Sequence, residues 1–426
     1  MSATADLLAF AGAAHRLPDS VHADAVRLLG DTLAVGAAGA GAPGAEAILS
    51  AARAMGSGSE ARLLGSGERL PAAGAAFVNG YRIHCLEWDA VHEPAVVHAM
   101  SVVTAALGAA IDRRGGCDAE QALAALAVGV DIACGLGLAA DSPLGFFRPA
   151  TAGVIGAALA VARIDDAPLD HALGLAYSSA AGTMQAHVEG SIALPFQVAN
   201  AARAAVSASD LAKAGFTGPL DPLEGPFGYF TLFDQGDLAR YTGDLGHIWR
   251  ISEISTKPFP SGRASHAALG ALQSLAGQGV DRIELACPPL IHRLVGRPYR
   301  AAMTPAYARL CLPFLAALML TDGRIDPRRF TPADLADPEL ARLAGVVSLV
   351  PDGNDDPNAL FPQQLRVTVA SGEVRTIAIP DTLGSPAAPL SREQQEAKQM
   401  LARSLAGDIA DSRLLADPLA YFVEPR

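Results

Sequence analysis

The sequence predicts a mainly α-helical protein, with a large all-helical domain and a smaller α/β unit. Its 426 residues correspond to two or three domains at roughly 150 residues each. Half of the residues are hydrophobic but only 5% are aromatic, so the core must be packed largely from small and aliphatic side chains. Up to residue 214 the apolar residues recur at spacings of three and four, the period of a buried helix face, whereas strand-like alternation appears only after residue 254.

The helical pattern divides into segments of ordinary length, each closed by Gly, Pro or Asp. The helices predicted in this part are Val21–Gly36, Ala45–Met55, Pro71–Asn79, Val97–Arg113, Ala119–Leu138, Ala150–Ile164, Pro168–Met184 and Leu194–Ala214. The small residues of Gly153–Ala162 predict that the central helices approach each other closely.

The character of the chain changes near Ile254. Strands are predicted at Arg282–Cys287, Leu365–Ala370 and Glu373–Ile379. Ser371–Gly372, between the last two strands, is a two-residue hairpin signal. Helices are predicted at Ser265–Gln278, Tyr307–Thr321 and Pro332–Ala344. Mixed strands and helices indicate a second, α/β unit.

The chain becomes helical again after a break at Gly384–Pro389. Ser391–Leu405 predicts an amphipathic helix, whose polar face carries Arg392, Glu393, Glu396 and Lys398. We expect this helix to return to the helical domain. The helical domain is therefore assigned to residues 1–254 and 386–426, and the α/β domain to residues 255–385.

Composition excludes several classes of function. The formal net charge is -12 and no dense Lys/Arg run occurs, which argues against a nucleic-acid partner. Apolar stretches are interrupted before about 20 residues, so no membrane span is expected. The N-terminus lacks the basic start of a secretory signal, so no signal peptide is expected. The five cysteines are scattered along the chain, and we expect them to be reduced residues of the core. We expect a cytoplasmic protein whose anionic ligands meet a locally cationic pocket.

The densest polar cluster is residues 84–98, just before a predicted helix. Its ionisable members are His84, Glu87, Asp89, His92, Glu93 and His98. A helix start offers free N–H groups and a positive dipole end, which suit an anionic ligand. Two other interpretations are a surface loop that caps the next helix, and a metal site built from His92 and His98 with Glu87 or Asp89. The spacing matches no zinc motif, so no metal is assigned.

A second cluster, residues 257–266, lies at the predicted domain boundary. Its two prolines stiffen a loop that presents Lys257 and Arg263, and an arginine fork suits a carboxylate. Solvated cations on a linker are the alternative. Arg148, before the helix at Ala150, is interpreted either as a substrate clamp or as a surface residue. His187 and Glu189 are interpreted as parts of a solvated loop. No Walker loop, GxSxG or dinucleotide fingerprint occurs.

Several ordered motifs resemble the MmgE/PrpD family. They are Phe77-Val78-Asn79-Gly80, His84, Trp88-Asp89, His98, Phe216-Thr217-Gly218-Pro219, Leu223-Glu224-Gly225, Lys257-Pro258-Phe259-Pro260 with Arg263 and His266, and Thr321-Asp322-Gly323. The similarity extends almost from end to end. The family includes 2-methylcitrate dehydratase, cis-aconitate decarboxylase and iminodisuccinate epimerase, which act on small polycarboxylates without a metal or organic cofactor. The resemblance implies a homodimer, with the active site between a large, discontinuous helical domain and an α/β lid.

The resemblance also assigns individual residues. His98 matches the family's histidine, Lys257 its lysine at the edge of the lid, and Asp89 the first Asp of its pair. The chain departs from the pattern at Phe147 and Gln197, where the family has His, at Leu194, where it has Lys, and at Phe314, where it has Tyr. Because an unpaired buried carboxylate costs several kcal/mol, these departures predict a smaller or less anionic, partly apolar substrate.

The function predicted from these residues is a cofactor-independent lyase of the dehydratase type, acting on a small carboxylic acid. His98 is the expected general acid/base, oriented by Glu87 or Asp89, which could also serve as the base. Lys257 is expected to stabilise negative charge. The expected substrate contacts are Arg263, Arg148, His92 and His266. The alternatives are an isomerase or epimerase that uses the same proton abstraction, and a catalytically silent binding paralogue.

Overall fold

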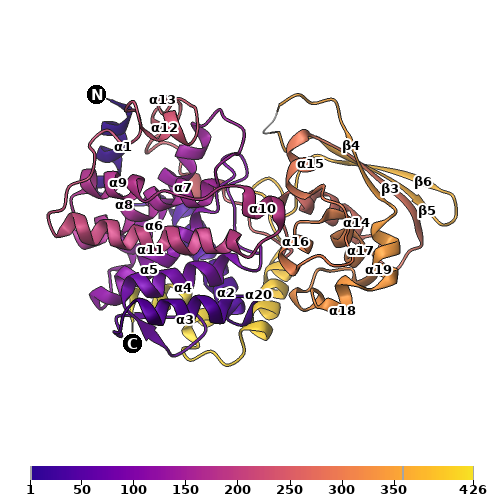
Figure 1. The fold of residues 1–426 in the computed structure, drawn as a ribbon, viewed down its shortest axis with the longest axis horizontal. Helices are drawn as coiled ribbons and strands as arrows, with labels where there is room; N and C mark the ends of the chain where they lie inside the picture. Colours follow the sequence, from indigo (N-terminus) through magenta and orange to yellow (C-terminus); the bar gives the residue numbers. More distant parts are fainter. Residues whose placement is uncertain (1, 357–358, 426) are drawn as a thin grey trace.

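The computed structural model describes residues 2–356 and 359–425, and it is mainly α-helical (Figure 1). The helices before residue 260 are α1 (Ala3–Gly12), α2 (Asp19–Ala38), α3 (Ala45–Met55), α4 (Ala72–His84), α5 (Ala99–Arg114), α6 (Ala119–Leu138), α7 (Arg148–Thr151), α8 (Gly153–Asp165), α9 (Leu169–Ser178), α10 (Gln185–Glu189), α11 (Ala193–Lys213), α12 (Tyr229–Leu232) and α13 (Ala239–Thr242). Two short strands, β1 (Ala61–Arg62) and β2 (Arg69–Leu70), pair antiparallel between α3 and α4. Short 3-10 helices are η1 (Gly39–Gly41), η2 (Arg250–Glu253), η3 (Arg263–Ser265) and η4 (Pro327–Arg329).

The centre of the helical part is a layer of long helices that pack against one another, α4, α5, α6, α8 and α11. The crossing of α6 and α8 is very close: a Cβ placed on Gly156 would lie 2.2 Å from the carbonyl oxygen of Gly129. Only glycine fits there, which confirms the prediction that small residues let the central helices approach. By length and composition α6 could span a membrane, but 89% of its most apolar 18-residue stretch is buried inside the protein.

The chain beyond residue 260 carries the second sheet. Its helices are α14 (His266–Gln273), α15 (Pro289–Val295), α16 (Pro305–Ala308), α17 (Leu312–Asp322), α18 (Pro332–Leu335) and α19 (Pro338–Ala344). Its strands are β3 (Val280–Cys287), β4 (Val347–Pro351), β5 (Gln363–Val369) and β6 (Val374–Ile379). The sheet order is β4-β3-β5-β6, with β3 parallel to β4 and antiparallel to β5. The hairpin between β5 and β6 turns at Gly372, whose φ of 85° favours glycine.

Prolines divide two segments that the periodicity predicted as continuous helices. The structure replaces 307–321 with α16 and α17, where Pro313 lies in the first turn of α17. It replaces 332–344 with α18 and α19, because Asp337 caps a new helix that starts at Pro338. In addition, 150–164 is divided into α7 and α8 at Ala152, α9 ends at Ser178 rather than 184, and β4 was not predicted.

Buried apolar side chains form two clusters. The larger one runs from Leu7 through the helical layer and includes C-terminal residues such as Phe422, and the smaller one surrounds the second sheet between Phe259 and Ile379. Four of the cysteines are buried, Cys117 is half-buried, and all five are free. The division into domains at residues 254 and 386, and the role of the α/β part as a lid, stay predictions.

The C-terminal segment lies beside the first helices, far from the sheet (Figure 1). It consists of α20 (Arg392–Ala406), α21 (Arg413–Ala416) and α22 (Pro418–Val423), and α20 packs on α2. Lys398, which the sequence placed on the polar face of α20, is not exposed like the other residues of that face. Lys398 is buried, and its Nζ lies 2.6 Å from Asp31 Oδ1 and donates to the carbonyl of Trp88.

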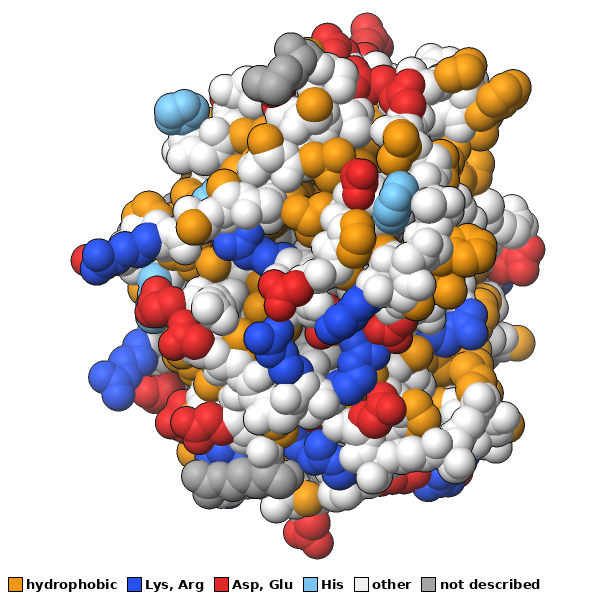
Figure 2. Space-filling model, turned by 90° about the vertical axis from the view of Figure 1, so that its left-hand side faces the viewer, with side chains coloured by type: hydrophobic (Ala, Val, Ile, Leu, Met, Phe, Trp, Pro, Cys, Tyr) orange, Lys and Arg blue, Asp and Glu red, His pale blue; other side chains and the backbone are white. Residues whose placement is uncertain are grey.

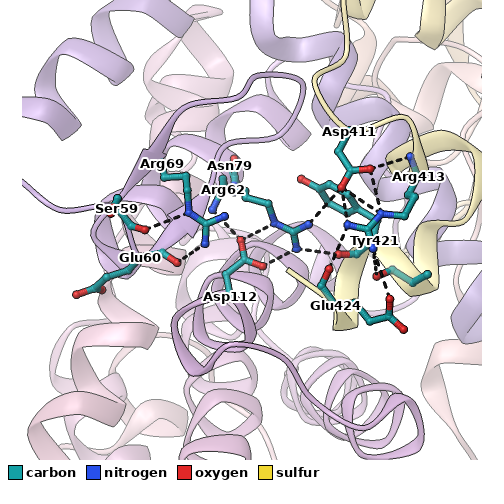
Figure 3. A network of polar contacts seen from close by, with 11 residues as sticks. Ser59, Glu60, Arg62, Arg69, Asn79, Asp112, Asp411, Arg413, Tyr421 and Glu424 are labelled. Carbon is teal, nitrogen blue, oxygen red and sulfur yellow. Dashed lines mark hydrogen bonds and ion pairs between the residues drawn. The ribbon is translucent and has the colours of Figure 1, made fainter. Parts of the chain in front are cut away.

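A polar network fastens the end of the chain (Figure 3). Arg62 donates to Asp112 from its backbone N, Nε and Nη2, and Nη2 also donates to the carbonyl of Tyr421 in α22. The Arg62 guanidinium lies 4.1 Å from the Tyr421 ring centroid. On the end of the molecule that Figure 2 shows, Lys and Arg side chains are interspersed with Asp and Glu.

Candidate active site

The loop between α4 and α5 carries the first predicted cluster, residues 84–98. It starts where α4 ends at His84 and stops at His98, the N-cap of α5. Val91 pairs with Ser255 in an isolated antiparallel bridge, which places the loop beside the segment that leads to Lys257. The structure therefore brings the two predicted clusters together.

Two non-glycine residues of this loop have left-handed backbone conformations. Glu87 and Val96 both have a φ of 54°. For a β-branched residue such as Val96 this conformation is a clear outlier, and such strain persists only where the surroundings impose it. The loop is held on both sides of this region, because Trp88 Nε1 donates to the carbonyl of Pro258 and the Trp88 carbonyl accepts from Lys398.

Asp89 is the centre of the cluster and is fully buried. Its Oδ2 forms hydrogen bonds with His84 Nδ1, at 2.9 Å, and with the Ser101 hydroxyl. It also lies 3.0 Å from His98 Nδ1, an ion-pair contact without hydrogen-bond geometry. Its Oδ1 lies 3.8 Å from Lys257 Nζ and has no hydrogen-bond partner among the described residues. Burial alone would raise the pKa of Asp89, but His84, His98 and Lys257 hold it well below its usual range.

Lys257 contacts Glu87 as well as Asp89. Its Nζ donates to the Glu87 carbonyl at 3.1 Å and to Glu87 Oε2 at 3.2 Å. Burial opposes ionisation of Glu87, but Lys257 and His84 lower its pKa to about 2. Glu87 is therefore a carboxylate over the whole physiological pH range.

The two histidines on Asp89 have opposite pKa shifts. For His84, burial lowers the pKa, but the carboxylates of Asp89 and Glu87 outweigh burial and raise it above its ordinary value. For His98, burial and the nearby Lys257 ammonium outweigh Asp89 and lower the pKa. The rings lie 4.8 Å apart in an edge-to-face arrangement. One imidazole is thus favoured as the cation and the other as the neutral base, a separation typical of acid/base sites.

A cavity of about 80 Å³ opens beside these histidines. Its polar lining residues are His84, Glu87, His98, Arg148, His187 and Arg263. Most of the remaining lining is apolar: Val91, Val96, Leu144, Phe147, Pro149, Met184, Leu194, Ala264, Leu294, Val295 and Leu310. Because His98 Nδ1 faces Asp89, its Nε2 is the ring nitrogen left for a ligand. We call this space the main cavity.

The two predicted arginines line the main cavity, but both already have carboxylate partners. Arg148 contacts Asp234 through Nε and Nη2, each at 3.2 Å. Arg263 Nη2 donates to Glu93 Oε1 at 2.8 Å. Their charges are therefore largely compensated before any substrate arrives.

Four predicted residues do not line the main cavity: the buried Asp89, described above, and Lys257, His92 and His266. Lys257 lies behind Glu87, with no exposed surface. His92 is buried with its Nε2 3.0 Å from Glu253, and His266 is buried with its Nε2 3.0 Å from Ser261 Oγ. The structure brings Lys257 to the cluster but places His92 and His266 outside the cavity.

His187 was predicted to lie in a solvated loop, and this prediction is wrong. It belongs to α10, is buried and lines the main cavity. Burial and Arg297 lower its pKa to about 4, so it is neutral at pH 7. The short, glycine-terminated segment gave no periodic signal that could have revealed its burial.

The positions where the chain departs from the family pattern separate into two groups. Phe147 and Leu194 line the main cavity and make it apolar. Gln197 instead forms hydrogen bonds with the backbone of Thr183, and Phe314 is buried in the second apolar cluster.

The residues that could hold a metal differ from the set that was considered as an alternative from the sequence. His84, Asp89 and His98 offer ligand atoms within 4.8 Å of one another, whereas His92 is bound to Glu253. Both Nδ1 atoms already face the same carboxylate oxygen, and the Lys257 ammonium lies 3.8 Å from the other. The Lys257 ammonium would repel a divalent cation at this place. The set of donor atoms therefore suits proton transfer better than metal binding.

Comparisons with known proteins agree with the motifs. The model of the MmgE/PrpD N-terminal domain matches residues 9–242, and that of the MmgE/PrpD C-terminal domain matches residues 259–413. A cis-aconitate decarboxylase of Homo sapiens is 27% identical over 354 residues, covering 78% of this chain and 72% of the relative. That of Mus musculus is 26% identical over 418 residues, covering 90% and 84%, and one of Aspergillus terreus is 24% identical, covering 93% and 87%.

Proposed function

Because the chain belongs to the MmgE/PrpD family, we propose that it is a cofactor-independent lyase of small carboxylic acids, in which His98 moves the proton. One observation carries this proposal: His98 Nδ1 lies 3.0 Å from the buried Asp89 carboxylate while its ring borders a largely apolar cavity. Asp89 favours the tautomer with the proton on Nδ1, which leaves the Nε2 lone pair free. The lowered pKa of His98 keeps this base neutral at pH 7.

In a dehydration, His98 Nε2 takes the proton from the carbon next to the substrate carboxylate. The electron pair of that C–H bond forms the double bond, and the β-hydroxyl group leaves with the proton that His98 returns, as water. The imidazolium formed in between is stabilised by Asp89, so the carboxylate needs no proton of its own. Lys257, held by Glu87, helps the two histidines to keep Asp89 ionised.

Decarboxylation is a second candidate, because relatives of this chain are called cis-aconitate decarboxylases and the main cavity is mostly apolar. An apolar site disfavours a carboxylate more than the charge-dispersed state that loses CO₂. The C–CO₂ bond would break, its electron pair would stay on carbon, and that carbon would take a proton from the histidine pair.

An epimerase would use the same histidine but return the proton to the same carbon. A silent binding paralogue would bind acids and convert none. The homodimer, the cytoplasmic location and the absence of nucleic-acid, membrane and metal partners stay predictions. Light scattering after size-exclusion chromatography would test the homodimer.

The test starts from a thermal-shift screen of dicarboxylates and hydroxy acids, followed by proton NMR of each hit in deuterated water. Water loss, CO₂ loss, and deuterium entering unreacted substrate identify the three reactions. We expect one of the first two. Binding without any conversion would overturn the lyase proposal and favour the silent paralogue.

A further inference from the structure

A second, smaller cavity of about 40 Å³ lies next to the main cavity. The two cavities share His84, Glu87, Leu194 and Leu310 among their lining residues and therefore adjoin each other. The other residues around the second cavity are Pro43, Cys85, Ala186, Gly190, Ser191, Ile192, Pro195, Pro305, Ala306 and Arg309. It contains one cation, Arg309, that none of the sequence motifs singled out.

Arg309 is only 5% exposed, yet it forms no ion pair with a carboxylate of the described residues. Its Nη1 makes one long hydrogen bond, 3.4 Å, to the Cys85 carbonyl, and its buried Nε has no partner in the part of the chain that the structure describes. The guanidinium lies 4.9 Å from the Phe330 ring centroid. A buried cation without a counter-ion is costly, so a fold that keeps one calls for an explanation.

The carboxylates near the shared lining residues already have other partners. Glu87 and Asp89 contact Lys257 and His84, and Arg148 and Arg263 are paired with Asp234 and Glu93. Among the arginines that line either cavity, Arg309 is therefore the one without an ion pair to a described residue, and Glu87 attracts it only from beyond contact distance.

The start of α11 adds to this positive potential. Ser191, Ile192, Leu194 and Pro195, at the N-terminal end of this 21-residue helix, line the second cavity. The N-terminal end of a long helix carries a partial positive charge and favours anions. Two independent sources of positive potential therefore converge on one enclosed space.

We propose that the second cavity is a carboxylate subsite, in which Arg309 holds the second acidic group of a dicarboxylate whose reacting carbon lies beside His98. The inference rests on the proposed function and narrows its substrate class. A dicarboxylate places one carboxylate at Arg309 and the rest of the molecule in the apolar main cavity. A monocarboxylate of the same length leaves Arg309 uncompensated.

Calorimetry tests this with matched ligands: malonate, succinate and glutarate against propionate, butyrate and valerate. We expect at least one dicarboxylate to bind tenfold or more tightly than the monocarboxylate of its length. Arg309→Met should abolish this preference and Arg309→Lys should keep part of it. No preference in the unaltered protein, or a preference that survives in Arg309→Met, would overturn the proposal.

Thermal unfolding separates binding from a structural role. Because Arg309→Met removes an uncompensated buried charge, its unfolding midpoint should equal or exceed that of the unaltered protein. Arg403→Met, which removes an exposed charge on α20, controls for net charge. A lower midpoint than this control, or a failure to fold, would contradict the assignment. A preference lost in Arg309→Met without turnover of any ligand would instead sink the lyase proposal and leave the subsite intact.

Discussion

Two buried carboxylates of this protein, Asp112 and Asp89, are both paired with cations, but in different ways. Asp112 receives three hydrogen bonds from Arg62, which also holds the carbonyl of Tyr421 (Figure 3). Asp89 is shared by His84, His98 and Lys257, and its Oδ1 has no hydrogen-bond partner among residues 2–356 and 359–425. The first arrangement is an arginine–carboxylate pair that fastens the C-terminus. The second arrangement joins two histidines, which can gain and lose a proton, and it lies next to a cavity. It can therefore transfer a proton to or from a ligand.

The largest effect is expected at the shared carboxylate. Asp89→Asn should lower kcat by about 10³–10⁴-fold, because an amide neither fixes the tautomer of His98 nor stabilises its imidazolium. Steady-state kinetics measure this effect. Circular dichroism must show a native fold, and activity within tenfold of the unaltered protein would remove Asp89 from the mechanism.

Arg62→Met tests the other carboxylate. Removing one partner of a buried pair leaves Asp112 uncompensated, so the free energy of unfolding should fall by about 3–5 kcal/mol. Urea unfolding measures the loss, while kcat of the protein that remains folded should be unchanged. If kcat fell as much as in Asp89→Asn, the separation between a fastening pair and a reacting pair would be lost.

The smallest effect is in the pH profile. His98, with its lowered pKa, must be neutral to accept a proton, so activity should fall only below the ordinary value of 6.5. His84, with its raised pKa, loses its charge above 6.5; because its ring lines the main cavity, this loss should weaken binding of a carboxylate substrate and give an alkaline limb. The profile of kcat/KM should therefore be bell-shaped around this value, with apparent pKa values that belong to the coupled pair. An acid limb centred above 6.5 would contradict the neutral state of His98.

Local sequence patterns predict much of the fold, but they predict less of the candidate active site. Periodicity predicted the long helices, and alternation with a glycine turn predicted β5 and β6. The proximity of His98 and Lys257 could be expected only from the family resemblance, because 159 residues separate them and tertiary contacts alone bring them together. Lys398 was placed on a polar face and His187 in a solvated loop since a charged or polar residue is usually exposed, but Asp31 and the walls of the main cavity override that tendency. The counter-ions of Arg148 and Arg263 were likewise invisible in the sequence.

The central claim is that His98 carries the proton. The most direct measurement is proton NMR in deuterated water, comparing the unaltered protein with His98→Gln on a substrate found by the thermal-shift screen. We predict that His98→Gln keeps the fold and the binding of that substrate while its turnover, including any deuterium exchange, falls by about 10²–10⁴-fold. Undiminished turnover in His98→Gln would contradict the account.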